Sequence, residues 1–145
     1  MKRKITHIRD LEIIEKELSE RQVGIFAANT EREKVIQMAT TFVYLHKNIY
    51  VFFDEENEIY KDVNLENDGS FIIFQNRVVN SKSYITSISI SGIVKKVEDN
   101  RTMTEIRDNY LQKYSKSMDL FDKDTANLKA LFIDSEEFLA IDQEE

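Results

Sequence analysis

The stretch IYVFF at residues 49–53 decides the fold, because five consecutive aliphatic and aromatic residues favour a strand that is buried in a sheet. An acidic segment, residues 54–58, interrupts the sheet and leads into a short helix predicted around residues 57–66. The chain then returns to a strand pattern in SFIIF at residues 70–74. The triplet Asn67-Asp68-Gly69 before it predicts a turn, with the glycine in the left-handed region.

The residues before this stretch predict a β-meander. Residues 23–27 form a short apolar run, the polar cluster at 29–34 predicts a turn, and a return strand is expected at about 35–45. The strand at 49–53 is then the third of the meander. Ahead of these strands, residues 8–20 carry leucine and isoleucine at spacings of three and four, which predicts an amphipathic packing helix.

The residues after the stretch predict a long strand, a helix and a hairpin. The long strand is expected at residues 84–97, and one of its faces is small and polar. The sequence TMTE at 102–105 fits a capping box, so a second helix is expected from there to about Lys116. Strands at 128–133 and 137–141, with a turn at 134–136, complete the chain.

This order of elements predicts a mainly β protein. A single domain, residues 1–145, is expected to form an antiparallel β-barrel with helices outside, because a closed sheet removes its own edges. The chain has 41% hydrophobic residues, which is enough for one core and not for two.

The composition excludes several classes of protein. The apolar runs fall short of the roughly 20 residues that a membrane-spanning helix needs. The chain has no cysteine and only two histidines, His7 and His46, so thiolate chemistry is excluded and no metal site is expected. The basic first residues are followed by no apolar signal segment, so a cytoplasmic protein is expected.

The charge pattern argues against a nucleic-acid partner. The net charge is -7, and the lysines and arginines are interspersed with acids rather than gathered in a stripe. With three glycines and no proline, the sequence contains neither a GxGxxG loop nor a Walker lysine. A nucleotide held by a glycine-rich loop is therefore not expected.

The segment KDVNLENDGSF at residues 61–71 resembles the pyridoxamine 5′-phosphate oxidase-like family of FMN-binding split barrels. Members of that family often carry a lysine, two variable residues, an asparagine, an aliphatic residue, two further residues and an Asn-Pro pair before the next strand; Asn67 stands at the second asparagine. The run ISISGIVKKV at 88–97 is similar to the long strand of the family, and the resemblance spans about residues 20–100. It implies an antiparallel split β-barrel, a homodimer, and an FMN cofactor at the subunit interface.

The chain also departs from that family. Asp68 stands where proline usually follows the asparagine, and Ile59 and Tyr60 replace the serine or threonine before the lysine. The C-terminal tryptophan and arginine elements of the true oxidase are absent, so the oxidase reaction itself is not expected. The haem-degrading branch of the superfamily is a more distant alternative.

The resemblance assigns the cofactor-binding role to five residues. Lys61 is expected near the start of the short helix, where its ammonium and backbone N–H groups would hold the FMN phosphate, and Asn64 would lie one turn along. Gln37, Thr40 and Thr41 lie on a strand whose family counterpart runs beside the flavin, so they would bind its pyrimidine edge. The alternatives are a solvated Lys61, a structural hydrogen bond from Asn64, and threonines that only favour a strand.

Other polar and aromatic residues have less defined roles. Arg77 and Lys82 flank a polar loop and are either solvated or a source of positive charge for a phosphate in the same or the partner subunit. The aromatic residues of the strands are expected to fill the core and a dimer interface. The histidines have no visible partner and receive no catalytic role.

The function expected from these features is that of an FMN-binding split-barrel flavoprotein, a flavin-dependent oxidoreductase acting on an unknown small molecule. In such a protein the flavin carries the electrons, which fits the absence of a visible acid–base signature. A flavin-free binding module on the same fold, or a haem-binding relative, is the alternative.

Overall fold

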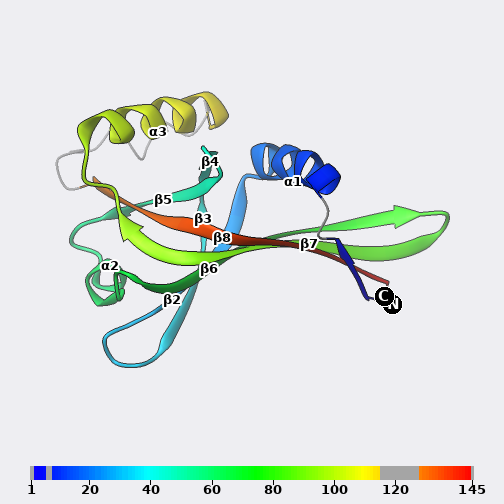
Figure 1. Ribbon diagram of the computed structural model, residues 1–145, viewed down its shortest axis with the longest axis horizontal. Coiled ribbons are helices and arrows are strands. Elements are labelled where there is room, and N and C mark those ends of the chain that lie inside the picture. The colour runs from blue at the N-terminus through cyan, green and yellow to red at the C-terminus, as the bar shows by residue number, and fades with distance from the viewer. Residues whose placement is uncertain (1, 6–7, 115–127, 145) are drawn as a thin grey trace.

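One antiparallel sheet carries the fold of the computed structural model, which describes residues 2–5, 8–114 and 128–144 (Figure 1). The strands lie in the order β3-β2-β6-β7-β8-β5-β4, and β1 pairs with β8. The strands are β1 (Lys2–Ile5), β2 (Val23–Asn29), β3 (Val35–Thr41), β4 (Val43–Leu45), β5 (Asn48–Asp54), β6 (Asn67–Val79), β7 (Lys82–Lys96) and β8 (Leu128–Glu144), and the helices are α1 (Ile8–Glu20), α2 (Glu58–Asp62) and α3 (Asn100–Lys113). The prediction of a mainly β, antiparallel split barrel with helices outside is confirmed.

The sheet curls until its two terminal strands meet at Phe42. Because β3 ends at Thr41 and β4 begins at Val43, a single residue joins the two ends of the sheet. Phe42 is fully buried there, with its ring centroid 4.7 Å from that of Phe71. We call residues 41–43 the seam. Among the described residues, β3 is the last strand at its end of the sheet and has one edge that pairs with no other strand.

The inner face of the curled sheet encloses the main core. Residues Phe26, Ala28, Ile49, Val51, Phe53, Phe71, Ile73, Ile88, Ile90, Val94, Leu131, Ile133 and Ala140 are all buried in it. Helix α1 adds Ile14 and Leu18 to this core, as its predicted apolar stripe requires.

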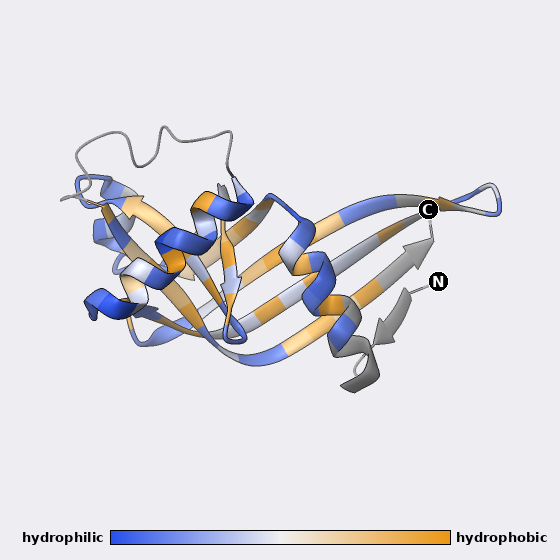
Figure 2. Cartoon of the chain, turned by 90° about the horizontal axis from the view of Figure 1, so that it is seen from above, coloured by the Kyte–Doolittle hydropathy of each residue, from blue (hydrophilic) through white to orange (hydrophobic). Residues whose placement is uncertain are grey.

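Strand β5 is buried on both faces, which explains its unbroken apolar run. Ile49, Val51 and Phe53 point into the barrel. Tyr50 and Phe52 point to the outer face, where α3 covers them, and the ring of Phe52 meets that of Tyr110 edge to face at 5.4 Å. Figure 2 shows the two helices α1 and α3 lying above the sheet.

Two of the predicted turns are strands in the structure. Gly69 lies within β6, paired with Ala28 and Gly92, and no glycine has a positive φ; the left-handed residue is Glu66, at φ 60°. Residues 134–136 lie within the continuous strand β8, opposite a register shift at Ser91/Gly92. A Cβ on Gly92 would collide with the carbonyl oxygen of Asp134. The turn-forming residues therefore mark a β-bulge, and the predicted final hairpin is wrong.

The helices also differ from the prediction in their ends. The N-cap of α3 is Asp99, whose carboxylate accepts a hydrogen bond from the Thr102 N–H at 2.8 Å, so the capping box predicted at 102–105 is wrong. Helix α3 ends at Lys113, and Lys116 lies outside the described residues. Helix α2 has five residues, fewer than predicted. Among the described residues, no helix is long and apolar enough to span a membrane.

The hairpin of β6 and β7 is much longer than predicted and projects from the sheet (Figure 1). It turns at Asn80 and Ser81, whose φ angles of 52° and 65° suit a two-residue turn between twisted strands. The last pair that β7 makes with β8 is at Tyr84. We call residues 76–83, which form the tip of this hairpin, the arm. Its sequence, NRVVNSKS, is too polar to show a strand pattern.

Candidate functional site

The chain around α2 is held against the loop that leads into β3. The Glu31 N–H donates to the Asp62 carbonyl at 3.0 Å, and the Asn64 N–H donates to the Asn29 carbonyl at 2.8 Å. Thr30 and Val63 form an isolated antiparallel bridge between these segments. The end of α2, which carries Lys61, is therefore fixed beside the start of β3.

Lys61 lies in the last turn of α2 and not near its start, so that part of the prediction is wrong. Its side chain is exposed, and its backbone N–H donates to the Asn57 carbonyl at 3.3 Å. Because Glu58 occupies the first turn, the positive end of this short helix faces an acid. An anion at Lys61 would thus be held by the ammonium group rather than by the helix N-terminus.

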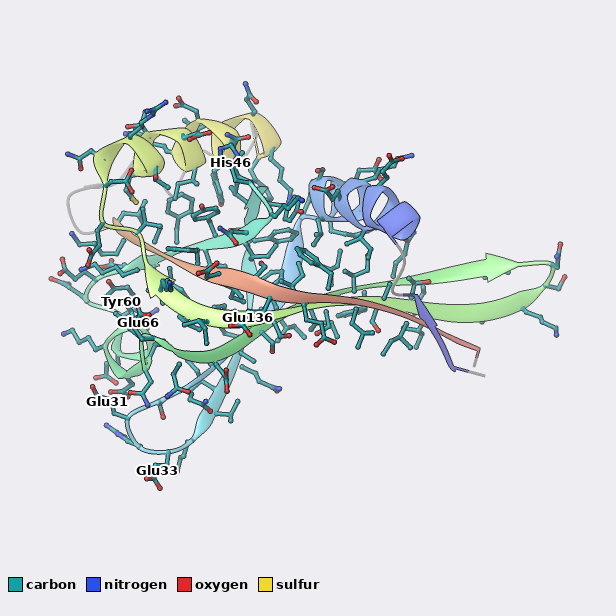
Figure 3. All side chains as sticks on the ribbon, viewed as in Figure 1. Glu31, Glu33, His46, Tyr60, Glu66 and Glu136 are labelled. Atoms are coloured by element: carbon teal, nitrogen blue, oxygen red, sulfur yellow. The ribbon has the colours of Figure 1, made fainter. Side chains whose placement is uncertain are left out.

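The charges around Lys61 are mixed. The Arg32 guanidinium lies 3.9 Å from the Asp62 carboxylate, and both side chains are exposed. Figure 3 shows Glu31 on the β2–β3 loop near α2, whereas Glu33 lies at the tip of that loop and points away from α2. A phosphate at this place would meet cations and acids together, and screening by water weakens both.

Asn64 already has a structural partner. Its side-chain amide donates to the Thr30 carbonyl at 3.2 Å, which ties the segment after α2 to the β2–β3 loop. This is the structural hydrogen bond that the alternative interpretation expects.

The three predicted residues of β3 do not share one environment. Gln37 is exposed and pairs with Ala27 on the outer face of the sheet. Thr41 lies on the same face, but its hydroxyl is 3.1 Å from that of Tyr110 in α3. Thr40 points to the other face, and its hydroxyl donates to the Thr41 carbonyl at 3.1 Å. Among the described residues, the Gln37 side chain has no hydrogen-bond partner that a ligand would have to displace, unlike the side chains of Thr40 and Thr41.

A polar cluster at the seam was not identified from the sequence. The Tyr114 hydroxyl lies 2.7 Å from the Gln22 carbonyl and 2.9 Å from that of Phe42, and it accepts from the Phe42 N–H at 3.2 Å. The Lys113 ammonium donates to the carbonyls of Leu18 and Phe42, each at 3.3 Å, and lies 3.7 Å above the Phe42 ring. The amphipathic pattern of the helix predicted from residue 102 to about Lys116 includes Tyr114 in its buried stripe but not Lys113, since a lysine in a helix ordinarily indicates a solvated face.

Burial shifts the pKa values of this cluster in opposite directions. It raises the pKa of Tyr114 to about 12 and lowers the pKa of Lys113 to about 8, because each neutral form tolerates the apolar surroundings better. The carbonyls and the ring favour the ammonium, but they do not outweigh its desolvation.

Lys113 is expected to make stability rise with pH. Because its folded pKa lies below its usual 10.5, the unfolded chain binds more protons between about pH 8 and 10.5, and the free energy of unfolding increases there. One pKa unit corresponds to about 1.4 kcal/mol, so partial exposure leaves a gain on the order of 2 kcal/mol. Urea unfolding between pH 7 and 9.5 should show this rise for the wild type but not for Lys113→Met. If the free energies of unfolding of wild type and Lys113→Met changed with pH in the same way, Lys113 would not be desolvated.

The raised pKa of Tyr114 lowers the free energy of unfolding only above about pH 10, where the tyrosines of the unfolded chain lose their protons.

An open cavity of about 300 Å³ lies on the outer face of the sheet. It is lined by Ala27, Ala28, Asn29, Val35, Asp68, Gly69, Ser70 and Ser91. None of the five predicted cofactor-binding residues lines it. Its volume is at the lower limit of ordinary ligand pockets. No group of three or more His, Cys, Asp or Glu residues that could hold a metal ion occurs among the described residues.

Comparison with solved structures identifies the same fold in proteins that bind different cofactors. A FAD-binding protein from Mesorhizobium loti superposes with a TM-score of 0.74 at 14% identity, over 99% of both chains. A protein assigned as a pyridoxamine 5′-phosphate oxidase from Corynebacterium glutamicum gives 0.62 at 12%, over 100% of both chains. The haem storage protein HutZ from Vibrio cholerae gives 0.66 at 11%, over 88% of this chain and 91% of that one.

Sequence comparison adds nothing to this result, since no family model and no curated protein matches the chain. The fold is that of the flavin-binding, pyridoxamine 5′-phosphate oxidase-like split barrels. At these identities the likeness establishes the fold alone.

Proposed function

We propose that this protein is an FMN-binding flavoprotein that acts as a homodimer, and that it is a flavin-dependent oxidoreductase. The fold is shared with a FAD-binding protein over nearly its whole length, which supports a flavin as the ligand. The choice of FMN rests on the resemblance of residues 61–71 to the FMN-binding family.

One observation carries the proposal: the end of α2 lies beside the start of the free-edged strand β3. Lys61 there offers an exposed ammonium for a phosphate, which is a charge-assisted partner. The unpaired edge of β3 offers backbone donors and acceptors, which are the groups that a flavin pyrimidine edge requires. Gln37 adds an exposed amide on the same strand. This set of donors fits a flavin mononucleotide.

The dimer is supported by the outer face of β2 and β6. Val23 is 55% exposed and Phe74 is 58% exposed. The register continues this apolar surface through Ile25, which pairs with Ala39 on one side and Ile72 on the other. Helix α3 covers the outer face at β5 but leaves this part open. A contiguous apolar surface of this kind favours a second copy as its partner.

In the proposed reaction the flavin, when bound, would supply the electron transfer. The chain's own residues would bind and orient it: Lys61 at the phosphate, and β3 with Gln37 at the ring edge. The substrate is a small molecule whose chemistry these residues do not specify.

A haem-binding function is the second candidate, because HutZ, a haem storage protein, has the same fold. A flavin-free binding module is the third candidate. The acids near Lys61 favour it, since Asp62 and Glu31 both oppose a phosphate dianion.

The absorption spectrum of the purified protein distinguishes these three functions. A flavin gives two bands in the near-ultraviolet and blue, and mass spectrometry of the released ligand should then identify FMN. A Soret band would replace the flavin proposal with the haem one. A colourless protein that binds neither FMN nor haem on titration would leave the flavin-free module.

A further inference from the structure

The arm and the cavity lie on one face of the molecule, at opposite ends of β6. Side chains alternate along a strand, so Ser70, Phe74 and Val78 all point to the outer face. Ser70 lines the cavity, whereas Val78 on the arm is 73% exposed. Phe74 lies midway between them, four residues from each.

We infer that in the dimer the arm of one copy lies on the outer face of the other, with Val78 seated in the partner's cavity. This inference rests on the homodimer proposed above and not on the cofactor. Consider a two-fold axis that lies in the interface plane, perpendicular to β6, and passes over Phe74. It turns the outer faces of the two copies toward each other, and the β6 strands of the two copies then run in opposite directions. Position 78 of one copy then lies over position 70 of the other, and the two Phe74 side chains meet on the axis.

The shapes of the two surfaces are complementary. The cavity is lined mainly by small residues, among them Ala27, Gly69 and Ser91. On its outer face the arm presents the branched aliphatic side chain of Val78, which is 73% exposed. Seating it in the cavity removes both an exposed apolar side chain and an open hollow from water.

The arm and the end of the molecule that carries the cavity differ in charge. The arm carries Arg77 and Lys82 and no acid. Lys82 pairs with Val79 and therefore points to the face opposite Val78, so its charge would act on the partner through the long-range field rather than by contact. The cavity has Asp68 in its lining, and Glu66 lies at the same end of the molecule (Figure 3). One lysine of that end, Lys95, is already paired with Asp134 at 3.1 Å. Opposite charges would therefore steer the arm of the second copy to this end.

Disulfide cross-linking tests this arrangement directly, because the natural chain has no cysteine. Val78→Cys protein is mixed with Ser70→Cys protein and oxidised, and a linked dimer is expected on a non-reducing gel, with the 78–70 peptide pair found by mass spectrometry. A disulfide needs Cα atoms within about 7 Å. In the proposed dimer the two copies of residue 78 are separated by eight residues of strand, about 27 Å, so neither variant should cross-link alone. Val78→Cys mixed with Ser19→Cys, an exposed position on α1, is the matched control.

The outcomes separate the inference from the proposals on which it rests. Self-linking of Ser70→Cys would show that the β6 strands of the two copies run in the same direction across the interface. The protein would then be a dimer, but Val78 would not lie in the partner's cavity. A monomer mass by light scattering, or a dimer without the 78–70 link, would overturn the inference. A linked dimer that binds no FMN would support it while removing the cofactor.

A second measurement tests the charges. Reversing both cations of the arm, Arg77→Glu with Lys82→Glu, is expected to raise the dimer Kd about tenfold or more, and added salt should reduce the difference. Reversing two exposed lysines elsewhere, Lys16→Glu with Lys47→Glu, is the control and should leave the Kd within about twofold. Equal effects of the two pairs would refute the charge complementarity.

Discussion

Replacing Phe42 with alanine is expected to lower the free energy of unfolding by about 3–5 kcal/mol. The side chain is fully buried at the only residue between β3 and β4, and its ring packs on that of Phe71. The same ring lies 3.7 Å below the Lys113 ammonium, so its loss would leave that buried cation with fewer partners. Urea denaturation of the flavin-free protein, at fixed protein concentration, measures the loss.

The matched controls are Phe42→Leu and Leu65→Ala. The leucine fills most of the volume and should recover a large part of the stability. Leu65 is 44% exposed, and its truncation should cost less than about 1 kcal/mol. If Phe42→Ala cost no more than Leu65→Ala, the packing of Phe42 would not be what holds the two ends of the sheet together at the seam.

The seam also shows what the sequence could not predict. The segment from 35 to 45 has one continuous strand pattern, and the break at Phe42 arises because the curled sheet brings its two ends together there. That closure depends on β8, which pairs with β5 although more than seventy residues separate them. Local patterns carry no signal for such distant pairing. By contrast, the apolar run of β5 was predictable because it is buried on both faces, and the helix at 8–20 was predictable because its stripe faces one core.

The bulge in β8 has the same explanation. Ser135 and Glu136 favour a turn locally, but the Gly92 backbone lies directly against Asp134, and the long pairing with β7 keeps the strand continuous. Here tertiary pairing overrides turn chemistry. The arm was missed for the opposite reason, since its strands lack the apolar alternation that indicates a buried face.

The structure brings only some of the five predicted cofactor-binding residues together, and whether they bind a cofactor stays a prediction. Lys61 and Gln37 are both exposed near the start of β3. Asn64 and Thr41 belong to structural hydrogen bonds, which depend on segments distant in the chain, Thr30 and Tyr110. Lys61 was predicted near the start of the short helix but lies in its last turn, because α2 begins at Glu58 and has only five residues.

Replacing Lys61 with alanine is expected to weaken FMN binding by roughly ten- to hundredfold, which corresponds to a charged hydrogen bond of about 1.5–3 kcal/mol. The helix N-terminus gives no help at this position, and the acids of the β2–β3 loop oppose the phosphate, so the ammonium is the main favourable contact. The free energy of unfolding without flavin should change by less than about 0.5 kcal/mol, because the side chain is exposed. Titration of the flavin-free proteins with FMN, followed by fluorescence quenching, measures the affinity.

The control for this experiment is Lys16→Ala, which removes an equally exposed lysine from α1 and should leave FMN affinity unchanged. This control separates a contact with the phosphate from a general change in net charge, which is already -7 and repels the dianion at long range. Added salt should narrow the gap between wild type and Lys61→Ala only slightly if the ammonium touches the phosphate, and should abolish it if the lysine acts only through the field. Equal affinities of wild type and Lys61→Ala would remove Lys61 from the site, and no binding by the wild type would favour the flavin-free module.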